Sequence, residues 1–141
     1  MTLKIRPEQF DAFKEIADAA FARRLVQYVR DHHPEAVVKF SSGQSTISRL
    51  RDDVIRTMIK AGIARARAYG MTWESSIAAF VVLMFLTAPN FDQHPLIERV
   101  LKDQEVGPDS RIENLWHRVS GQNWRAVESY YDANEWKTDA R

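Results

Sequence analysis

The chain has 141 residues, a net charge of +1, no cysteine, and seven Phe, four Trp and four Tyr side chains. This length suits a single domain over residues 1–141, and the aromatic content argues against a disordered chain. The absence of cysteine excludes disulfide bonds, zinc–thiolate sites and thiol catalysis. Residues 1–70 carry 13 Lys/Arg against 8 Asp/Glu, whereas residues 71–141 carry 7 against 11. This asymmetry could orient a partner or bring the two halves of the fold together.

The first predicted element is a long amphipathic helix over residues 7–33. Pro7 suits the first turn of a helix, and Pro34 disfavours helix in the residue before it. The stretch before this helix has no apolar run typical of a signal peptide, so we expect a cytoplasmic protein. Between the two prolines, apolar residues recur at three- and four-residue spacing: Phe10, Phe13, Ile16, Ala17, Ala20, Phe21, Leu25 and Tyr28.

Residues 34–44 are predicted to form a connection rather than a regular element. Within it, residues 36–38 (Ala-Val-Val) could pair as a short strand. No second strand is apparent in the sequence to receive it, so the prediction contains no sheet.

A second helix is predicted over residues 45–69, with Ser45 or Thr46 as its N-cap. Gly62 costs about 1 kcal/mol relative to alanine inside a helix, so we expect a close helix crossing there. The predicted inner face consists of Ile47, Leu50, Val54, Met58, Ala61 and Tyr69.

The centre of the predicted fold is a helix over residues 73–88. Residues 77–88 contain no charge and only one polar side chain, but the run is too short to span a bilayer. A helix that is apolar on every face must be surrounded by other elements. Gly70 ends the preceding helix, Thr72 can cap this one and Pro89 ends it.

The segment after the central helix begins with a turn and a short helix. Asn90 and Asp92 are turn-forming residues, and Phe91 between them is expected to fill the core beneath the turn. Pro95 is expected to start a helix over residues 95–103.

Two more helices are predicted before the C-terminus. Ser110 and Glu113 fit the capping box of a helix over residues 110–120, which Gly121 ends. A last helix is predicted over residues 123–136. The sequence therefore predicts an all-α domain of five or six helices packed around the central apolar helix.

Four cations of the second predicted helix fall within about 40° of one another at 100° per residue: Arg49, Arg56, Lys60 and Arg67. This basic stripe could bind phosphates or an acidic partner. It could also be an ordinary solvated face, because Asp52 and Asp53 lie nearby and no base-stacking aromatic side chains interleave. Nucleic-acid binding is therefore not the expected function.

The C-terminal region is unusually rich in aromatic residues. These side chains could complete the core over the central helix, or some could stay exposed as anchors for a protein partner. The candidates are Trp116, Trp124, Tyr130, Tyr131 and Trp136.

The sequence contains no catalytic or cofactor-binding motif. It has no nucleophile elbow, no phosphate-binding glycine loop and no dinucleotide fingerprint. Its four histidines, His32, His33, His94 and His117, do not match zinc or di-iron spacings, and we expect His94 in a turn or cap. We therefore expect no enzymatic activity, no metal, no cofactor, no small-molecule substrate and no membrane insertion.

Residues 62–103 resemble a group of short helical proteins encoded beside type VI secretion spike and effector genes in proteobacteria. The resemblance extends over about two thirds of the chain, and its motifs are architectural rather than catalytic. Many members of the group have glycine where this chain has Ala88. The matching positions are the stretch Ile5 to Phe10, then Gly62, Ala66, Tyr69, Gly70, Leu83, Met84, Phe91, Asp92 and Pro95.

The resemblance implies a non-enzymatic helper of a secreted toxin or of its delivery spike. Such a helper could be an adaptor or chaperone that loads the effector, or an immunity protein that neutralises a cognate toxin. A weakly nucleic-acid-binding helical protein is a further alternative, based on the basic stripe. We expect a protein partner, an effector or a spike component, held through a helical face.

Overall fold

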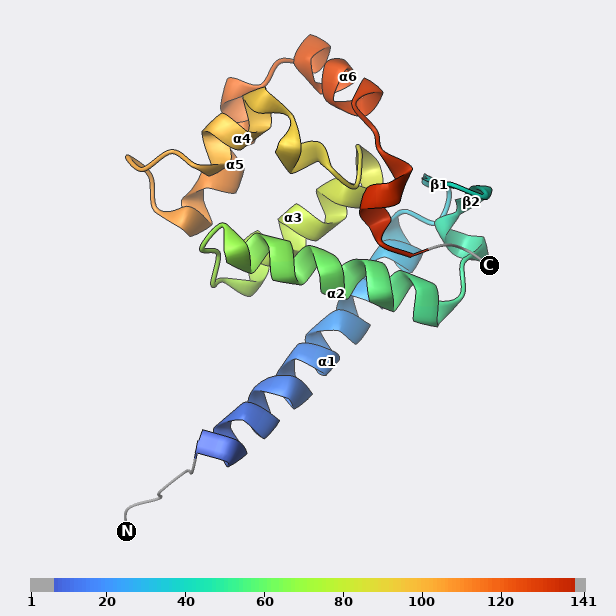
Figure 1. Ribbon diagram of the computed structural model, residues 1–141, viewed down its shortest axis with the longest axis vertical. Coiled ribbons are helices and arrows are strands. Elements are labelled where there is room, and N and C mark those ends of the chain that lie inside the picture. The colour runs from blue at the N-terminus through green and yellow to red at the C-terminus, as the bar shows by residue number, and fades with distance from the viewer. Residues whose placement is uncertain (1–6, 139–141) are drawn as a thin grey trace.

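The computed structural model describes the backbone of residues 7–138 and the side chains of residues 17–138. Helices make up 68% of the structure, which confirms the predicted all-α class (Figure 1). Within the described residues, the helices are α1 (Pro7–His32), α2 (Asp52–Ala68), α3 (Glu74–Leu86), α4 (Pro95–Leu101), α5 (Arg111–Arg118) and α6 (Gly121–Ser129). A small sheet of β1 (Val37–Phe40) and β2 (Gly43–Thr46) and four short 3₁₀ turns complete the described fold.

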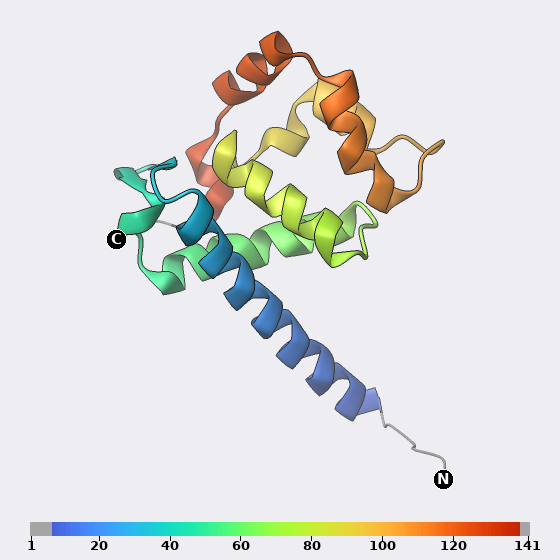
Figure 2. The ribbon, with the colours of Figure 1, turned by 180° about the vertical axis from the view of Figure 1, so that it is seen from behind.

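Helix α1 begins at Pro7 and ends at His32, close to the predicted limits. Its C-terminal half packs on the other helices, and its N-terminal half extends away from them (Figures 1 and 2). The side chains of Phe10, Phe13 and Ile16 lie outside the described part of the chain. Among the described residues of α1, the buried apolar side chains begin at Phe21.

The connection after α1 contains a β-hairpin that the sequence prediction lacked. The strands are antiparallel, with Val37 paired with Thr46 and Phe40 paired with Gly43. Gly43, the first residue of β2 after the two-residue turn, adopts a φ of 148°. The second strand, Gly-Gln-Ser-Thr, has no alternation of apolar and polar residues, so its sequence carried no strand pattern. Val38 on the first strand is buried.

The hairpin delays the start of the second helix. A 3₁₀ turn over Ile47–Arg49 follows β2, and α2 begins only at Asp52, with Arg51 at the N-cap. The predicted caps Ser45 and Thr46 are therefore wrong, because these residues belong to the strand. Arg30 of α1 holds this corner by donating to the carbonyl oxygens of Ile47 and Leu50 and by pairing with Asp52.

Helices α2 and α3 cross closely at Gly62, as predicted. A Cβ built at this position would lie 2.7 Å from Sδ of Met84 and 3.1 Å from Cγ2 of Val81, both on α3. Glycine at this position lets the Met84 and Val81 side chains of α3 pack directly against the backbone of α2. Two residues beyond the end of α2, Gly70 adopts a φ of 96°, which fits the predicted stop.

We expect Gly62→Leu to lower the free energy of unfolding by about 1–3 kcal/mol, because the added side chain must push α3 away from α2. The matched control is Ala64→Leu on the exposed side of the same helix, where we expect a change within about 0.5 kcal/mol. Urea unfolding of both variants measures the difference. Equal losses in the two variants would contradict the crossing described above.

The segment just before α3 is held by a distant part of the chain. The N-cap residue of α3 is Trp73, and the predicted cap Thr72 makes no such bond. Instead, the Asp109 carboxylate accepts hydrogen bonds from the backbone N–H groups of Thr72 and Trp73, at 2.8 Å and 2.7 Å. Burial raises the pKa of Asp109, but these hydrogen bonds together outweigh it and hold the pKa below its usual value.

The C-terminal helices agree with the prediction in part. Pro95 starts α4, and Nδ1 of His94 accepts from Leu96 N–H, so His94 is a cap as expected. The Ser110 capping box of α5 does not form. Gly121 begins α6 rather than ending α5, because the Ser120 hydroxyl caps this helix.

The last helix is shorter than predicted. It ends at Ser129, and a separate 3₁₀ turn over Ala133–Trp136 follows instead of a continuous helix to residue 136. This turn packs the C-terminal segment back against the body of the protein (Figure 1). Phe91 is fully buried beneath its turn, as predicted, with its ring 4.9 Å from that of Phe80.

Candidate protein-binding groove

One face of the apolar helix α3 is left partly open, contrary to the prediction that other elements surround it. The face toward α2 is fully buried and includes Phe80 and Val81. The opposite face carries a stripe at helical spacing that we call the α3 stripe: Ala78, Ala79, Val82 and Leu86. Its first three residues are only half-buried, and Leu86 is 44% exposed.

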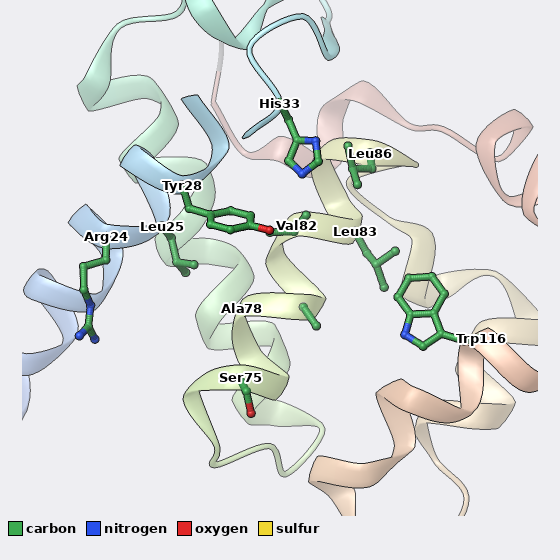
Figure 3. A pocket seen from close by; sticks show the side chains of 11 residues that line it. Arg24, Leu25, Tyr28, His33, Ser75, Ala78, Val82, Leu83, Leu86 and Trp116 are labelled. Carbon is green, nitrogen blue, oxygen red and sulfur yellow. The ribbon is translucent and has the colours of Figure 1, made fainter. Parts of the chain in front are cut away.

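The α3 stripe forms the floor of a groove of about 570 Å³. Figure 3 shows α1 on one side of this floor, with Leu25 and Tyr28 pointing toward it, and Trp116 of α5 on the other side. His33 and Ser75 lie at opposite ends. The groove is therefore a trough built by three helices that are far apart in the sequence.

The lining of the groove is apolar, with polar groups at its edges. Arg24 lies at one edge and is held by Glu74, its Nη2 atom 3.0 Å from the carboxylate oxygen. Tyr28 packs on His32, with ring centroids 4.4 Å apart. A concave apolar surface with a few polar groups at its rim is typical of sites that bind a partner or a ligand.

Trp116 is the most exposed of the large apolar side chains around the groove, at 58%. Its ring lies against that of Trp124, with centroids 6.0 Å apart, so Trp124 supports one side of the indole. An exposed indole held by a neighbouring ring is arranged as an anchor for a partner. Trp116 is therefore the predicted candidate that the structure places in the groove.

The other aromatic candidates have different positions. Tyr130 is exposed but lies edge-on to His94, outside the groove. Trp136 is 1% exposed and donates from Nε1 to the Tyr131 hydroxyl at 2.7 Å. That hydroxyl also bonds to the backbone N–H and carbonyl of Lys39, which ties the C-terminal turn to β1. The burial of Trp136 places it in the core rather than on a binding surface.

The predicted basic stripe is divided in the structure. Arg49 lies in the 3₁₀ turn before α2 and not on the helix. Arg67 forms an ion pair with Asp18 of α1 at 2.7 Å. Arg56 and Lys60 remain on α2 without an ion pair to any described residue.

A buried polar network was missed at the sequence level. Asp92, 3% exposed, pairs with the Arg65 guanidinium and accepts a hydrogen bond from the Tyr69 hydroxyl at 2.9 Å. Burial raises the pKa of Asp92, and the charge of Arg65 opposes that shift. Burial also raises the pKa of Tyr69.

These three side chains satisfy one another, so the network fastens the turn at Phe91 to α2 and leaves little capacity for chemistry. The sequence marked Asp92 only as a turn former. Its two partners lie more than twenty residues away, where periodicity carries no information about them.

The residues Tyr28 and Leu86 of the groove were also not predicted as site residues. Tyr28 belonged to the apolar face of the first helix, and Leu86 to a helix expected to be covered. When a helix is apolar all round, hydrophobic periodicity cannot tell which face its neighbours leave open.

Comparisons with protein-family models, with curated proteins and with solved structures find no match to this chain. No helix within residues 7–138 combines the length and apolar character needed to cross a membrane. Among the side chains of residues 17–138, no three His, Cys, Asp or Glu are grouped so that they could hold a metal ion.

Proposed function

We propose that this chain is a non-enzymatic protein-interaction module, an adaptor- or chaperone-like helper of a type VI secretion effector or spike protein. The observation that carries the proposal is the apolar groove between α1, α3 and α5, with Trp116 exposed at its edge. The resemblance of residues 62–103 to proteins encoded beside such effectors supports the class of partner.

The shape of the groove favours a helical segment of the partner as its occupant. The floor follows α3 from Ser75 to Leu86, a length of about 16 Å or three helical turns. An amphipathic helix binds such a trough through apolar anchors at i, i+3 or i+4, and i+7. Alanine at positions 78 and 79 leaves space over the floor for larger side chains of the partner.

The test is co-expression and co-purification with each protein encoded next to this gene, followed by a measured dissociation constant. We expect Trp116→Ala to weaken the complex by about 30-fold or more, as for a central anchor. Val82→Glu is expected to abolish it, since the complex would bury an unpaired carboxylate. Trp116→Ala should keep its thermal stability, because the Trp116 side chain is 58% exposed in the free protein. Val82 is half-buried, so the melting temperature of Val82→Glu is measured beside its binding.

The matched control is Trp73→Ala, which removes an equally exposed indole, 57% against 58%, that does not line the groove. It should bind like the wild type. The proposal fails if no neighbouring protein forms a complex, or if Trp116→Ala and Trp73→Ala weaken the complex equally. Rescue of cells from the partner toxin would indicate an immunity protein instead of an adaptor.

A further inference from the structure

The face of α1 that turns away from the groove packs on α2, and ion pairs hold this contact at both ends. Arg30 pairs with Asp52 at one end, with an N–O distance of 2.6 Å. Arg67 pairs with Asp18 at the other end, at 2.7 Å. Figure 2 shows α1 crossing α2 obliquely, and we call the surface between these two ion pairs the α1/α2 seam.

Cations without counter-charges occupy the middle of the α1/α2 seam. Arg23 and Arg56 line one hollow of about 280 Å³, together with Arg30 and Asp52. Asp52, which pairs with Arg30, is the only carboxylate that lines this hollow beside the three arginines. Within the described residues, neither Arg23 nor Arg56 has an ion pair.

Arg56 also carries an unsatisfied donor. Its Nε atom is buried and has no hydrogen-bond acceptor among the described residues. A buried N–H group without an acceptor is unfavourable, and so is the repulsion between neighbouring guanidinium groups. An anion in this hollow would offset the repulsion between the guanidinium groups.

A second hollow continues along the same seam. It has a volume of about 450 Å³ and is lined by Ala19, Ile63 and Ala64, with Lys60 and the Arg67–Asp18 pair at its edges. The seam therefore offers cationic and aliphatic surface side by side. A protein segment with a carboxylate next to an apolar side chain matches that order.

We propose that the α1/α2 seam binds an acidic segment of a partner protein, with one carboxylate entering the hollow between Arg23 and Arg56. Charge complementarity supports an acidic partner. A protein fits better than a nucleic acid, because no aromatic side chain lines either hollow for base stacking and aliphatic surface lies beside the cations.

This surface is separate from the apolar groove. Arg24, Leu25 and Tyr28 of α1 face the groove, whereas Arg23, Val26, Gln27 and Arg30 line the basic hollow. The two surfaces lie on different sides of one helix, so each could be occupied without displacing the other. An adaptor that bridges two proteins requires this arrangement.

The binding experiment uses the full chain and a fluorescent helical peptide that alternates glutamate with leucine and alanine. We expect binding at low salt that Arg23→Gln/Arg56→Gln weakens at least tenfold and that added salt also weakens. The matched control is Arg99→Gln/Arg125→Gln, which removes two exposed arginines of α4 and α6 without an ion pair to any described residue. It should bind like the wild type, and so should the groove variant Trp116→Ala.

Equal losses in the two double variants would reduce the effect to net charge and overturn the proposal. Absence of peptide binding would overturn it too, and so would tighter binding of a duplex DNA probe through the same arginines, which would indicate a nucleic-acid site. Inorganic phosphate should not displace the peptide at equal concentration. If it does, the hollow is a phosphate site and the proposal fails.

A stability measurement separates a binding role from a structural one. Arg56→Gln should leave the melting temperature unchanged or raise it, since it removes an unsatisfied, repelled charge. Arg30→Gln should lower it, because Arg30 holds the carbonyl groups of the corner before α2. A clear loss of stability in Arg56→Gln would make Arg56 structural and overturn the proposal.

Discussion

Arg65→Met is expected to lower the free energy of unfolding by about 3–5 kcal/mol at neutral pH. Asp92 is almost fully buried, and Arg65 is its charged partner. Removing the guanidinium leaves the buried Asp92 carboxylate without its cation, although it still accepts a hydrogen bond from the Tyr69 hydroxyl. Arg65 also donates to the Pro89 carbonyl, so the turn before Phe91 loses a second contact with α2.

The pH dependence of this variant has a defined sign. Burial raises the pKa of Asp92 above its unfolded value, and Arg65 pulls it down, so Arg65→Met should raise it further. A group with a raised pKa in the folded state binds its proton more tightly there, so its contribution to stability grows as pH falls. The cost of Arg65→Met should therefore be smaller at about pH 4 than at neutral pH.

Urea unfolding at the two pH values measures this effect. The control is the double variant Arg65→Met/Asp92→Asn, which removes both charges and should recover more than half of the loss. A cost that is the same at both pH values, or no recovery in the double variant, would mean that the pair does not act as a buried ion pair.

Trp136→Ala should cost about 3–5 kcal/mol of unfolding free energy, the range for a large aromatic side chain removed from a core. Trp136 is 1% exposed and lies against Phe85, with ring centroids 5.2 Å apart. Its indole also donates to the Tyr131 hydroxyl, which bonds to β1. The truncation therefore leaves a cavity beside α3 and loosens the contact of the C-terminal turn with the hairpin.

Trp136→Phe should cost less than Trp136→Ala, because a smaller ring still fills part of the site while the N–H donor is lost. The matched control is Trp116→Ala, the truncation of the same residue type in the groove, which should shift the urea midpoint little. Equal midpoints for Trp136→Ala and the wild type would contradict the burial of Trp136. Midpoints can be compared in this way only when the unfolding free energies of the variants fall with urea concentration at the same slope.

Local residue preferences correctly predicted several boundaries of the fold. Pro7 and Pro95 begin helices, and Gly70 follows one, because proline and glycine restrict or free the backbone in any tertiary context. Gly62 likewise marked a real close approach of two helices. The predicted N-caps at Thr72 and Ser110 were wrong, since α3 and α5 both begin without a side-chain cap, and Asp109 instead holds the segment before α3.

The candidate site was less predictable than the fold. The sequence identified Trp116 as an aromatic that could stay exposed, and Arg56 and Lys60 as cations on one helix. The sequence did not distinguish the exposed Trp116 from Trp136, which is buried. It also did not distinguish Arg56 and Lys60 from Arg67, which forms an ion pair. Each of these outcomes depends on a neighbour from another element.

By itself, the sequence determined the helical class, an apolar helix at the centre and the absence of thiol chemistry, because composition and spacing act locally. Tertiary structure alone decided which face of α3 stays open and which arginines remain without a counter-charge. The physical reason is that burial and ion pairing are set by side chains distant in the chain. Asp18, for example, neutralises Arg67 from a position 49 residues away, while Arg23 of α1 and Arg56 of α2 line one hollow.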